Sequence, residues 1–364
     1  MPFSYSTADS FAKVRIELNP DILDRHMAIR QFRHLLMAVL LLGILPPAHA
    51  FGPLGHRYVG SIADQLLSSR AQAEVKKILG MSLQEASTRL DCVKEVSGPP
   101  NFKYTSNPRY NASCVQFENP TAIAEMEDYV KRNWSNCKRG PGEDVCHRGY
   151  HYSDVDFHHD HYDRSYTGTS DHDIVSAITA AIAVLHGKQA PVPFSIKDQR
   201  EALFLLAHLI GDLHQPLHVG AVYLDSNDQP FDPDAPGHKP DLATETRGGN
   251  SIELGGSNLH GYWDAVSRTL DPDNVKQQAL DLAKAVPVTN GDPVSWPVVW
   301  ATDTLIVAKE AFTGIAYSHP GTKAKWKVTF ESRREYAAME RRVKAEQLVK
   351  AGARLAQVLN VDWR

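Results

Sequence analysis

The stretch from His208 to His218, which reads HLIGDLHQPLH, constrains the fold of this chain more than any other. His208 and Asp212 are four residues apart, so on a helix they lie on the same face. Pro216 lacks a backbone donor and ends the helix, which turns His218 back toward the same region. Two imidazoles and a carboxylate that converge at a helix end form a ligand set that suits zinc. The stretch therefore predicts a helix with a metal site at its C-terminal end.

More histidines and aspartates occur at spacings that could complete such a site. His260 and Asp264 are again four residues apart, which is about one helical turn. His151 lies in an aromatic segment, Asp91 lies two positions after an arginine, and His56 follows a Gly-Pro-Leu-Gly sequence. Any one of these residues alone is more often structural than a ligand. Their combination indicates metal binding, and the neighbouring residue His214 could orient one of the imidazoles.

The N-terminal residues have the pattern of a secretory signal peptide. A basic flank precedes an apolar run at residues 35–45, and an Ala-x-Ala motif ends at Ala50. The run is too short to span a bilayer comfortably. We therefore expect residues 1–50 to be a signal peptide with an upstream extension, with Met27 as a possible start. The mature chain would begin at Phe51 and would be secreted or periplasmic.

Composition and periodicity favour one mainly helical domain. Of 364 residues, 42% are hydrophobic and 23% are charged, as in soluble globular proteins, and the net charge of −4 argues against a bulk-electrostatic nucleic-acid binder. Helical patterns dominate, and residues 91–150 and 224–250 look loop-like because they are rich in turn-forming residues. The sequence therefore predicts a single helical domain with long surface loops over residues 51–364.

Individual elements can be placed from their start and stop signals. A Ser/Asp residue before an apolar-periodic segment indicates an N-cap, and a glycine after it indicates a C-cap. The expected elements are a helix at 70–79 capped by Ser69 and closed by Gly80, a buried helix at 174–185 capped by Asp171, a helix opened by a Ser195–Asp198 capping box, a helix at 333–359, and a strand at 251–254.

The chain has four cysteines, all in one stretch: Cys92, Cys114, Cys137 and Cys146. An even number in an exported protein indicates two disulfides. A zinc knot is the alternative, but the spacings lack paired Cys-x-x-Cys motifs. The sequence leaves three pairings open, of which we favour the sequential one, Cys92 with Cys114 and Cys137 with Cys146.

Taken together, these motifs resemble the zinc-dependent phospholipase C and single-strand nuclease superfamily. The chain is most similar to its nuclease branch, which contains mung bean nuclease and the fungal single-strand-specific nucleases. The resemblance extends from Gly-Pro-Leu-Gly-His, residues 52–56, to residues 351–360. The candidate ligands follow the order and local spacing of the family, so the resemblance implies the single-domain, mainly α fold of that superfamily.

The resemblance also implies three zinc ions, each with its own group of ligands. The first group is Asp91, His151, His208 and Asp212; the second is His218, His260 and Asp264; the third is His56, Asp212 as a bridge, and the amine and carbonyl of Phe51.

Four further residues are implied to act on the substrate. Tyr152 would stack on a base, Asp154 and Asn250 would bind its edge, and Lys94 would lie near the phosphate. Asp91 could also orient the attacking hydroxide. The alternative roles are structural: a core aromatic, a helix cap, a left-handed turn at Asn250, and a solvated lysine.

Two departures from the family and one histidine run complete the sequence evidence. Family members usually start with Trp where this mature chain would start with Phe51. The interval from Asp91 to His151 is longer than usual and holds every cysteine, so residues 92–150 would be an insertion. The histidine-rich run at residues 158–161 is interpreted as a solvated loop rather than a metal site.

The resemblance implies an exported zinc endonuclease that cleaves single-stranded DNA and RNA to 5′-phosphorylated products and also has 3′-nucleotidase activity. A pocket that takes an unpaired base would favour single strands, because paired bases cannot enter it. No stable protein partner and no membrane anchor after signal cleavage are expected. The alternatives are a phospholipase C-type phosphodiesterase and a non-catalytic zinc-binding protein.

Overall fold

The computed structural model describes residues 51–108, 111–140, 142–241, 243–319 and 326–363. The predicted signal peptide and its upstream extension, residues 1–50, lie outside the described residues. The described chain is mainly helical with a few short strands, which confirms the fold class predicted from the sequence. None of the described helices is long and apolar enough to cross a membrane.

Long helices form most of the structure. They are α2 (Gly52–Leu66), α3 (Ser69–Leu79), α7 (Pro120–Arg132), α9 (Ile174–Leu185), α10 (Gln199–Leu213), α12 (Gln277–Lys284), α13 (Trp296–Phe312) and α14 (Arg333–Asp362). Short helices and 3-10 turns connect them: α4 (Leu83–Ala86), α5 (Arg89–Val93), α6 (Asn111–Cys114), η1 (Val115–Phe117), α8 (Cys146–Gly149), η2 (Pro216–His218), α11 (Leu259–Asp264) and η3 (Pro293–Ser295).

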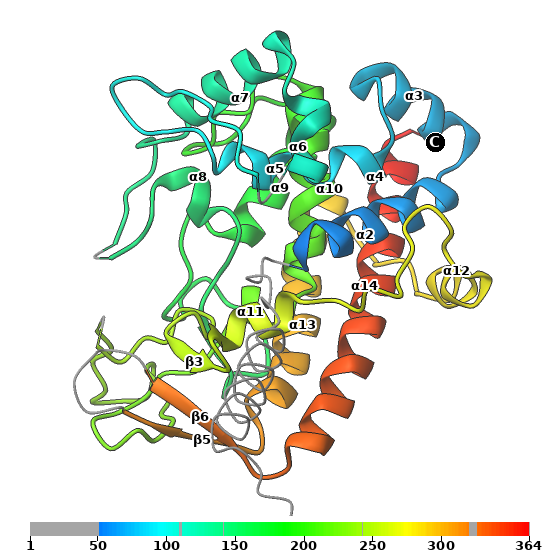
Figure 1. Ribbon diagram of the computed structural model, residues 1–364. Coiled ribbons are helices and arrows are strands. Elements are labelled where there is room, and N and C mark those ends of the chain that lie inside the picture. Colours follow the sequence, from blue (N-terminus) through cyan, green and yellow to red (C-terminus); the bar gives the residue numbers. More distant parts are fainter. Residues whose placement is uncertain (1–50, 109–110, 141, 242, 320–325, 364) are drawn as a thin grey trace, which may run out of the picture. The chain divides into compact units, whose positions relative to one another are not determined.

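Helix α10 occupies the centre of the helical body, and α9, α2 and α14 pack around it (Figure 1). Every residue of α10 from Glu201 to Leu213 is buried, and α9 is almost entirely buried as well. A helix that is apolar on all sides belongs in a core, which explains the composition of α9. The candidate ligands of α10 are therefore carried by the most enclosed helix of the fold.

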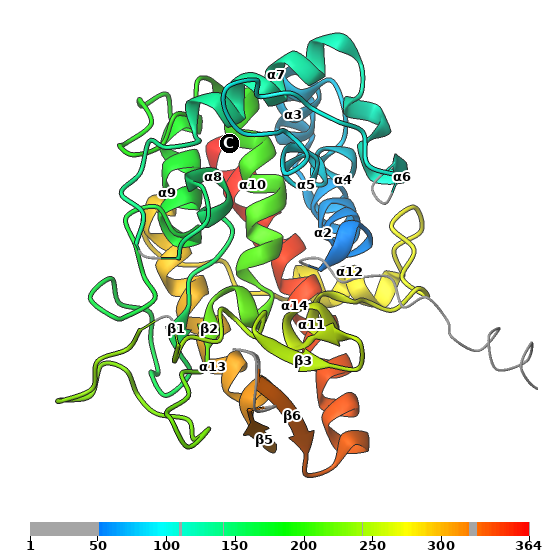
Figure 2. The same cartoon turned by 60° about the vertical axis from the view of Figure 1, so that its left-hand side comes forward.

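Short strands form two small sheets. Strands β3 (Ile252–Leu254), β4 (Ser257–Asn258), β5 (Ile315–Ser318) and β6 (Trp326–Phe330) pair in the order β4-β3-β6-β5, with β3 parallel to β6. This sheet lies at the end of the helical body where α14 begins (Figure 2), over a small core that includes Trp263 and Tyr336. Strands β1 (Val155–Asp156) and β2 (Gly220–Ala221) form a separate parallel pair. The strand predicted at 251–254 corresponds to β3.

The helix caps differ by one or two residues from those predicted. Ser68, not Ser69, accepts the hydrogen bond from the first turn of α3, and Gly80 ends that helix in the left-handed conformation as predicted. Asp173, not Asp171, caps α9. In each case a second Ser or Asp lies close to the true cap, and only the backbone conformation decides which side chain reaches the free amides.

The predicted capping box before α10 is wrong. Asp198 is itself the N-cap and accepts a hydrogen bond from the amide of Glu201 at 2.9 Å. Ser195 lies outside the helix, and its hydroxyl accepts a hydrogen bond from Arg132 at 3.0 Å. Glu201 also pairs with Arg132, so this residue pair ties α7 to the start of α10.

The cysteine-containing region is more ordered than its composition suggests. The disulfides Cys92–Cys114 and Cys137–Cys146 are present, which confirms the sequential pairing. Helix α7 lies inside the stretch that looked loop-like, and its buried Met126 joins the main core. The apolar face of α7 is short, and the turn-forming residues around it concealed its periodicity. That residues 92–150 are an insertion stays a prediction.

Candidate metal centre and adjacent pocket

Asp212, on the last turn of α10, lies at the centre of the candidate ligands and is fully buried. Its Oδ2 is 2.8 Å from His151 Nδ1 and 3.2 Å from His208 Nε2. Its Oδ1 is 3.2 Å from His56 Nε2. A carboxylate whose two oxygens face different imidazoles has the geometry of a bridging ligand.

Backbone pairing brings the His151 and His218 segments together. The amide of Ser153 donates to the His218 carbonyl at 2.8 Å, and the amide of Val155 donates to Val219 at 3.1 Å, in line with the β1–β2 pair. In return, His218 Nδ1 lies 2.7 Å from the His151 carbonyl. Because a carbonyl can only accept, the Nδ1 of His218 carries the proton.

A second group consists of His218, His260 and Asp264. The two Nε2 atoms are 3.2 Å apart, and Asp264 Oδ2 lies 3.6 Å from His260 Nε2. Asp264 Oδ1 lies 3.9 Å from His218 Nε2. Helix α11 places His260 and Asp264 one turn apart, as the spacing predicts, and Asn258 caps this helix.

The protein fixes the tautomers of two more candidate ligands. His208 Nδ1 lies 2.7 Å from the carbonyl of Ser87, and His260 Nδ1 lies 2.8 Å from the carbonyl of Gly248. Each imidazole therefore donates its Nδ1 proton to the backbone and turns the lone pair of Nε2 toward the cluster. This orientation is the one that a metal ligand requires.

His56 and Asp91 extend the cluster around Asp212. The ring of His56 stacks on that of His208 at a centroid distance of 3.8 Å. Ligand atoms of His56, Asp91 and His208 all lie within 4.8 Å of one another. Burial alone would raise the pKa of Asp91, but Lys94, whose Nζ donates to it at 2.9 Å, and the nearby imidazoles hold the pKa well below its usual range.

The donor set fits a divalent cation. Several buried polar atoms form no hydrogen bond with any described residue: both ring nitrogens of His56, Asp91 Oδ2, His208 Nε2 and Asp212 Oδ1. Unpaired buried lone pairs are costly unless something else satisfies them. The separations between facing ligand atoms run from 2.8 to 3.9 Å and bracket the edge of a zinc tetrahedron, about 3.3 Å for ligands about 2.0 Å from the ion.

One expected orienting residue points elsewhere, and another was missed. His214 accepts a hydrogen bond from Arg354 at 3.0 Å and contacts no candidate ligand through its ring nitrogens, so the sequence hypothesis for it is wrong. Gln215 has that role instead, because its Nε2 donates to Asp264 Oδ1 at 2.6 Å. The two residues are 49 positions apart in sequence, and no local pattern could reveal the contact.

Phe51 is completely buried at the start of α2. Its carbonyl accepts the amide of Gly55 at 2.9 Å. Gly55 is required there, since a Cβ at that position would lie 2.6 Å from the Cβ of Phe51. The aromatic ring of the predicted first residue is therefore part of the core, whereas its role as a ligand stays a prediction.

A cleft of about 440 Å³ opens over the candidate ligands His151, His218 and His260. Lys94 and Asn250 also line it, as the substrate-contact prediction requires. Asn250 donates to the Arg247 carbonyl and is not in the left-handed conformation, which Arg247 adopts instead, with φ of 55°. The structural role proposed for Asn250 as a left-handed turn residue is therefore wrong.

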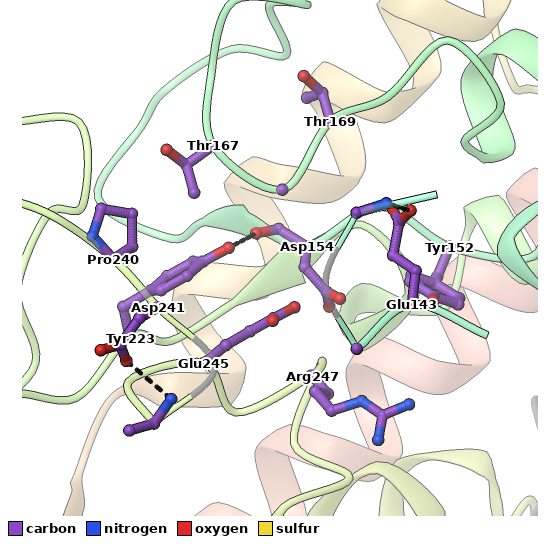
Figure 3. A pocket seen from close by; sticks show the side chains of 14 residues that line it. Glu143, Tyr152, Asp154, Thr167, Thr169, Tyr223, Pro240, Asp241, Glu245 and Arg247 are labelled. Carbon is purple, nitrogen blue, oxygen red and sulfur yellow. Dashed lines mark hydrogen bonds between the residues drawn. The ribbon is translucent and has the colours of Figure 1, made fainter. Parts of the chain in front are cut away.

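An adjoining pocket of about 700 Å³ shares Tyr152, Asp154 and Arg247 with the cleft (Figure 3). Asp154 is almost fully buried there, and Tyr223 donates to its carbonyl oxygen at 3.0 Å. The carboxyl groups of Asp154 and Glu245 lie close together in this pocket (Figure 3). Burial, and then the adjacent Glu245, raise the pKa of Asp154 well above its usual range.

Comparison with known proteins identifies the family. A family model described as S1/P1 nuclease matches residues 51–362. Endonuclease 4 of Arabidopsis thaliana is 27% identical over 182 residues, which cover 50% of this chain and 49% of that protein. Endonuclease 1 of the same plant is 28% identical over 183 residues, 44% of this chain and 48% of that protein.

The chain thus spans about half the length of the relatives it matches, whereas the family model covers nearly all of the described residues. S1/P1 nucleases depend on metal ions, and the buried His/Asp groups around Asp212 and Asp264 are of the kind that can bind them. The match agrees with the nuclease branch that the sequence motifs resemble. The chain belongs to the S1/P1 nuclease family.

Proposed function

We propose that this protein is a zinc-dependent endonuclease that hydrolyses phosphodiester bonds in single-stranded DNA and RNA to 5′-phosphorylated products, and that it also acts as a 3′-nucleotidase. The observation that carries the proposal is the buried carboxylate of Asp212, which faces His56, His151 and His208 beside a second His/His/Asp group. A pocket of about 700 Å³, large enough for a nucleotide base, adjoins this centre.

Three zinc ions would be held by the ligands implied from the sequence. The allocation is Asp91, His151, His208 and Asp212 for the first ion, His218, His260 and Asp264 for the second, and His56, Asp212 and the amine and carbonyl of Phe51 for the third. Such ions would supply Lewis acidity for the attack of water and for the charge on the leaving oxygen. The unpaired atoms around Asp212 support this allocation.

Asp91 and Lys94 would act directly on the reacting groups. Oδ1 of Asp91 accepts a hydrogen bond from Lys94, whereas its Oδ2 has no hydrogen-bond partner among the described residues. This second oxygen could accept a hydrogen bond from the attacking water. The bond would turn a lone pair of the water oxygen toward the phosphorus atom. Lys94 lines the cleft, where its charge would offset that of the phosphoryl oxygens.

Tyr152, Asp154 and Asn250 would bind the base beside the scissile bond. Tyr152 and Asp154 line both the cleft and the pocket, and Asn250 lines the cleft. A ring for stacking and polar groups for the base edge favour an unpaired nucleotide, because a base in a duplex cannot leave its stack without cost. Single-strand preference follows from this arrangement.

Export to an oxidising compartment is part of the proposal. The basic and apolar pattern before Ala50 is that of a cleavable signal, and two disulfides are typical of proteins outside the cytoplasm. Amino-terminal sequencing of the exported protein should begin at Phe51, and a start at Met1 or Met27 would contradict this part.

The test is one panel on purified protein that starts at Phe51. It measures zinc content and the hydrolysis of a single-stranded oligonucleotide, the matched duplex, a 3′-nucleotide and phosphatidylcholine. We expect bound zinc, preference for the single strand, and release of phosphate from the 3′-nucleotide. Hydrolysis of the lipid alone would indicate a phospholipase, and zinc binding without any hydrolysis would indicate a non-catalytic zinc protein.

A further inference from the structure

A His/Asp group outside the metal centre joins two surface loops. His159, in the loop after β1, has its Nε2 at 2.8 Å from Asp234 Oδ2 and at 3.6 Å from Asp232 Oδ1. The three ligand atoms all lie within 4.8 Å of one another. The two aspartates belong to the long loop at residues 224–247, so the group connects segments about 70 positions apart.

Neighbouring groups hold the members of this group in place, and Asp232 Oδ1 accepts the amide of Asp234 at 2.9 Å. The ring of His159 stacks on Tyr166 at a centroid distance of 3.7 Å and an angle of 7°, and only 12% of the side chain is exposed. Asp234 Oδ1 accepts both the amide of Thr167, at 3.0 Å, and its hydroxyl, at 2.6 Å. Asp234 Oδ2 faces His159 and also accepts the Thr167 amide at 3.3 Å. The bonds from Thr167 therefore orient this carboxylate in the way that surrounding hydrogen bonds orient metal ligands.

The rest of the histidine run behaves differently. His158 pairs with Asp156 in β1, and His161 pairs with the adjacent, exposed Asp160. Of these histidines, His159 is the one whose ring nitrogen faces two carboxylates. The solvated-loop interpretation of residues 158–161 therefore holds for His161 but does not describe His159.

The charge and spacing of the group suit a divalent cation better than an ion pair. One imidazolium can neutralise one carboxylate, which leaves the second without a counter-charge. The separations of 2.8 and 3.6 Å span the ligand–ligand edges of octahedral and tetrahedral ions, about 3.0 and 3.4 Å for ligands about 2.1 Å away. One nitrogen and two carboxylate oxygens favour zinc or a similar borderline ion.

We propose that His159, Asp232 and Asp234 form a further divalent-cation site, separate from the centre at Asp212, that binds zinc and fastens the loop after β1 to the 224–247 loop. Three protein ligands leave positions for water, and Asp232 is partly exposed, so binding should be weaker than at the buried centre. The proposal does not depend on the nuclease function.

The site would shape the pocket beside the metal centre. Thr167, which Asp234 holds, lines that pocket from one loop, and Asp241 and Glu245 line it from the other. A cation between the loops would therefore fix the distance between two walls of the pocket. Its loss should loosen the pocket but leave the buried centre intact.

Zinc titration of the full mature protein tests the proposal. After dialysis against a weak chelator that leaves the buried centre loaded, calorimetry should detect one further zinc equivalent. His159→Ala and Asp232→Asn should each weaken that binding more than tenfold, whereas the matched control His158→Ala should not. Asp232→Asn removes charge from a partly exposed side chain, so the test does not depend on one variant that might misfold.

Two outcomes overturn the site: a further equivalent that persists in both His159→Ala and Asp232→Asn, or the absence of any equivalent beyond the buried centre in the parent protein. Nuclease activity on the single-stranded oligonucleotide is measured in parallel. Inactive parent protein that still shows the further equivalent would contradict the proposed function and leave this site supported.

Discussion

Among single residues, Asp212 is central to the proposed centre, because its two oxygens face three imidazoles from separate parts of the chain. Burial alone would raise the pKa of this carboxyl, but His208, His218 and His151 hold it well below its usual range. The group is therefore ionised in the folded protein at neutral pH. A charged carboxylate shared by two ions is the feature that would distinguish the proposed centre from three independent sites.

Asp212→Asn tests that feature. The amide keeps the shape of the side chain but loses the charge and one acceptor, so we expect the loss of about two zinc equivalents and of activity. His260→Ala, which removes a ligand of one ion, should lose about one equivalent. Zinc content by mass spectrometry checks both variants, and an unchanged content in Asp212→Asn would exclude the bridging role.

Gln215 provides a second test at this scale, because it orients Asp264 without facing an ion itself. Gln215→Leu keeps the size of the buried side chain and removes both of its hydrogen bonds, the one of 2.6 Å to Asp264 and the one accepted from the Leu217 amide. Loss of such a bond behind a ligand costs about 10–100-fold in metal affinity. Gln357→Leu, in α14, is the matched control, since Gln357 bonds only to the Val286 and Pro287 carbonyls. Equal zinc affinity in both variants would refute the positioning role.

Among the elements, short α5 links the cysteine-containing region to the centre. It carries Asp91 and, at the next position, Cys92, which is bonded to Cys114. The second disulfide closes a shorter loop, with a sequence separation of 9 rather than 22, and lies at the start of α8. The two disulfides should therefore differ in their effect on metal binding even where they stabilise the fold by similar amounts.

Replacing both Cys92 and Cys114 with Ser should lower the free energy of unfolding by about 3 kcal/mol and also weaken zinc binding by Asp91. Replacing Cys137 and Cys146 with Ser should cost a similar free energy and leave zinc content unchanged. Denaturant unfolding and zinc analysis of both double variants measure this. Equal zinc content in the two would show that the disulfides act on stability alone.

The contact between α2 and α4 makes a pH-dependent contribution to stability. Asp64 in α2 accepts the amides of Leu83 and Gln84 at the start of α4, both at 3.0 Å. Burial raises the pKa of Asp64 to about 6 in spite of these bonds. A carboxyl whose folded pKa exceeds the unfolded value binds its proton more tightly in the folded state, so its contribution is lost as the pH rises through 6.

Asp64→Asn removes this titration. The stability of the parent protein relative to the variant should therefore fall between pH 4 and pH 7, by on the order of 1–3 kcal/mol for a shift of about two units. Comparing the two proteins at each pH cancels the titration of other groups. A constant difference across this range would mean that Asp64 titrates normally.

At the scale of the whole molecule, the proposed metal centre would depend on cleavage at the predicted processing site. Phe51 is buried at the start of α2, the helix that carries His56. If the amine of Phe51 binds zinc, a residue before it converts that amine into an amide and removes a ligand. Export and signal cleavage would then be required for activity.

Protein that begins at Phe51 should bind about three zinc ions and be active, whereas a form with an added N-terminal Met should bind about two and lose most activity. A form with one added residue at the C-terminus controls for the change in length. Intact mass confirms each start. Equal zinc content and activity in the Met-extended form would rule out the amine as a ligand.

Much of the arrangement around Asp212 could be predicted because the candidate ligands come in local patterns. His208 and Asp212, like His260 and Asp264, are one turn apart. Helix α10 ends at Leu213, shortly before Pro216, which has no backbone N–H to continue it. What escaped prediction depends on long-range contacts. The hydrogen bond from Gln215 to Asp264 and the pairing of Glu245 with Asp154 join segments whose proximity only the folded chain determines.

The helix caps were the other limit of the sequence evidence. Ser68 and Ser69 are chemically equivalent, and only backbone dihedral angles decide which one caps α3. Helix α7 was missed for a different reason, since prolines and cysteines around it resemble a loop. The apolar face of α7 can be recognised only in the folded structure, where it packs against the main core.

The pairing of β1 with β2 has a consequence for how members of this family can diverge. It joins the His151 and His218 segments through main-chain amides and carbonyls, which substitutions other than proline leave in place. The long loop at residues 224–247 begins shortly after this junction. Insertions, deletions or exchanges of that loop between relatives could therefore alter substrate preference while the spacing of the two histidines is inherited unchanged.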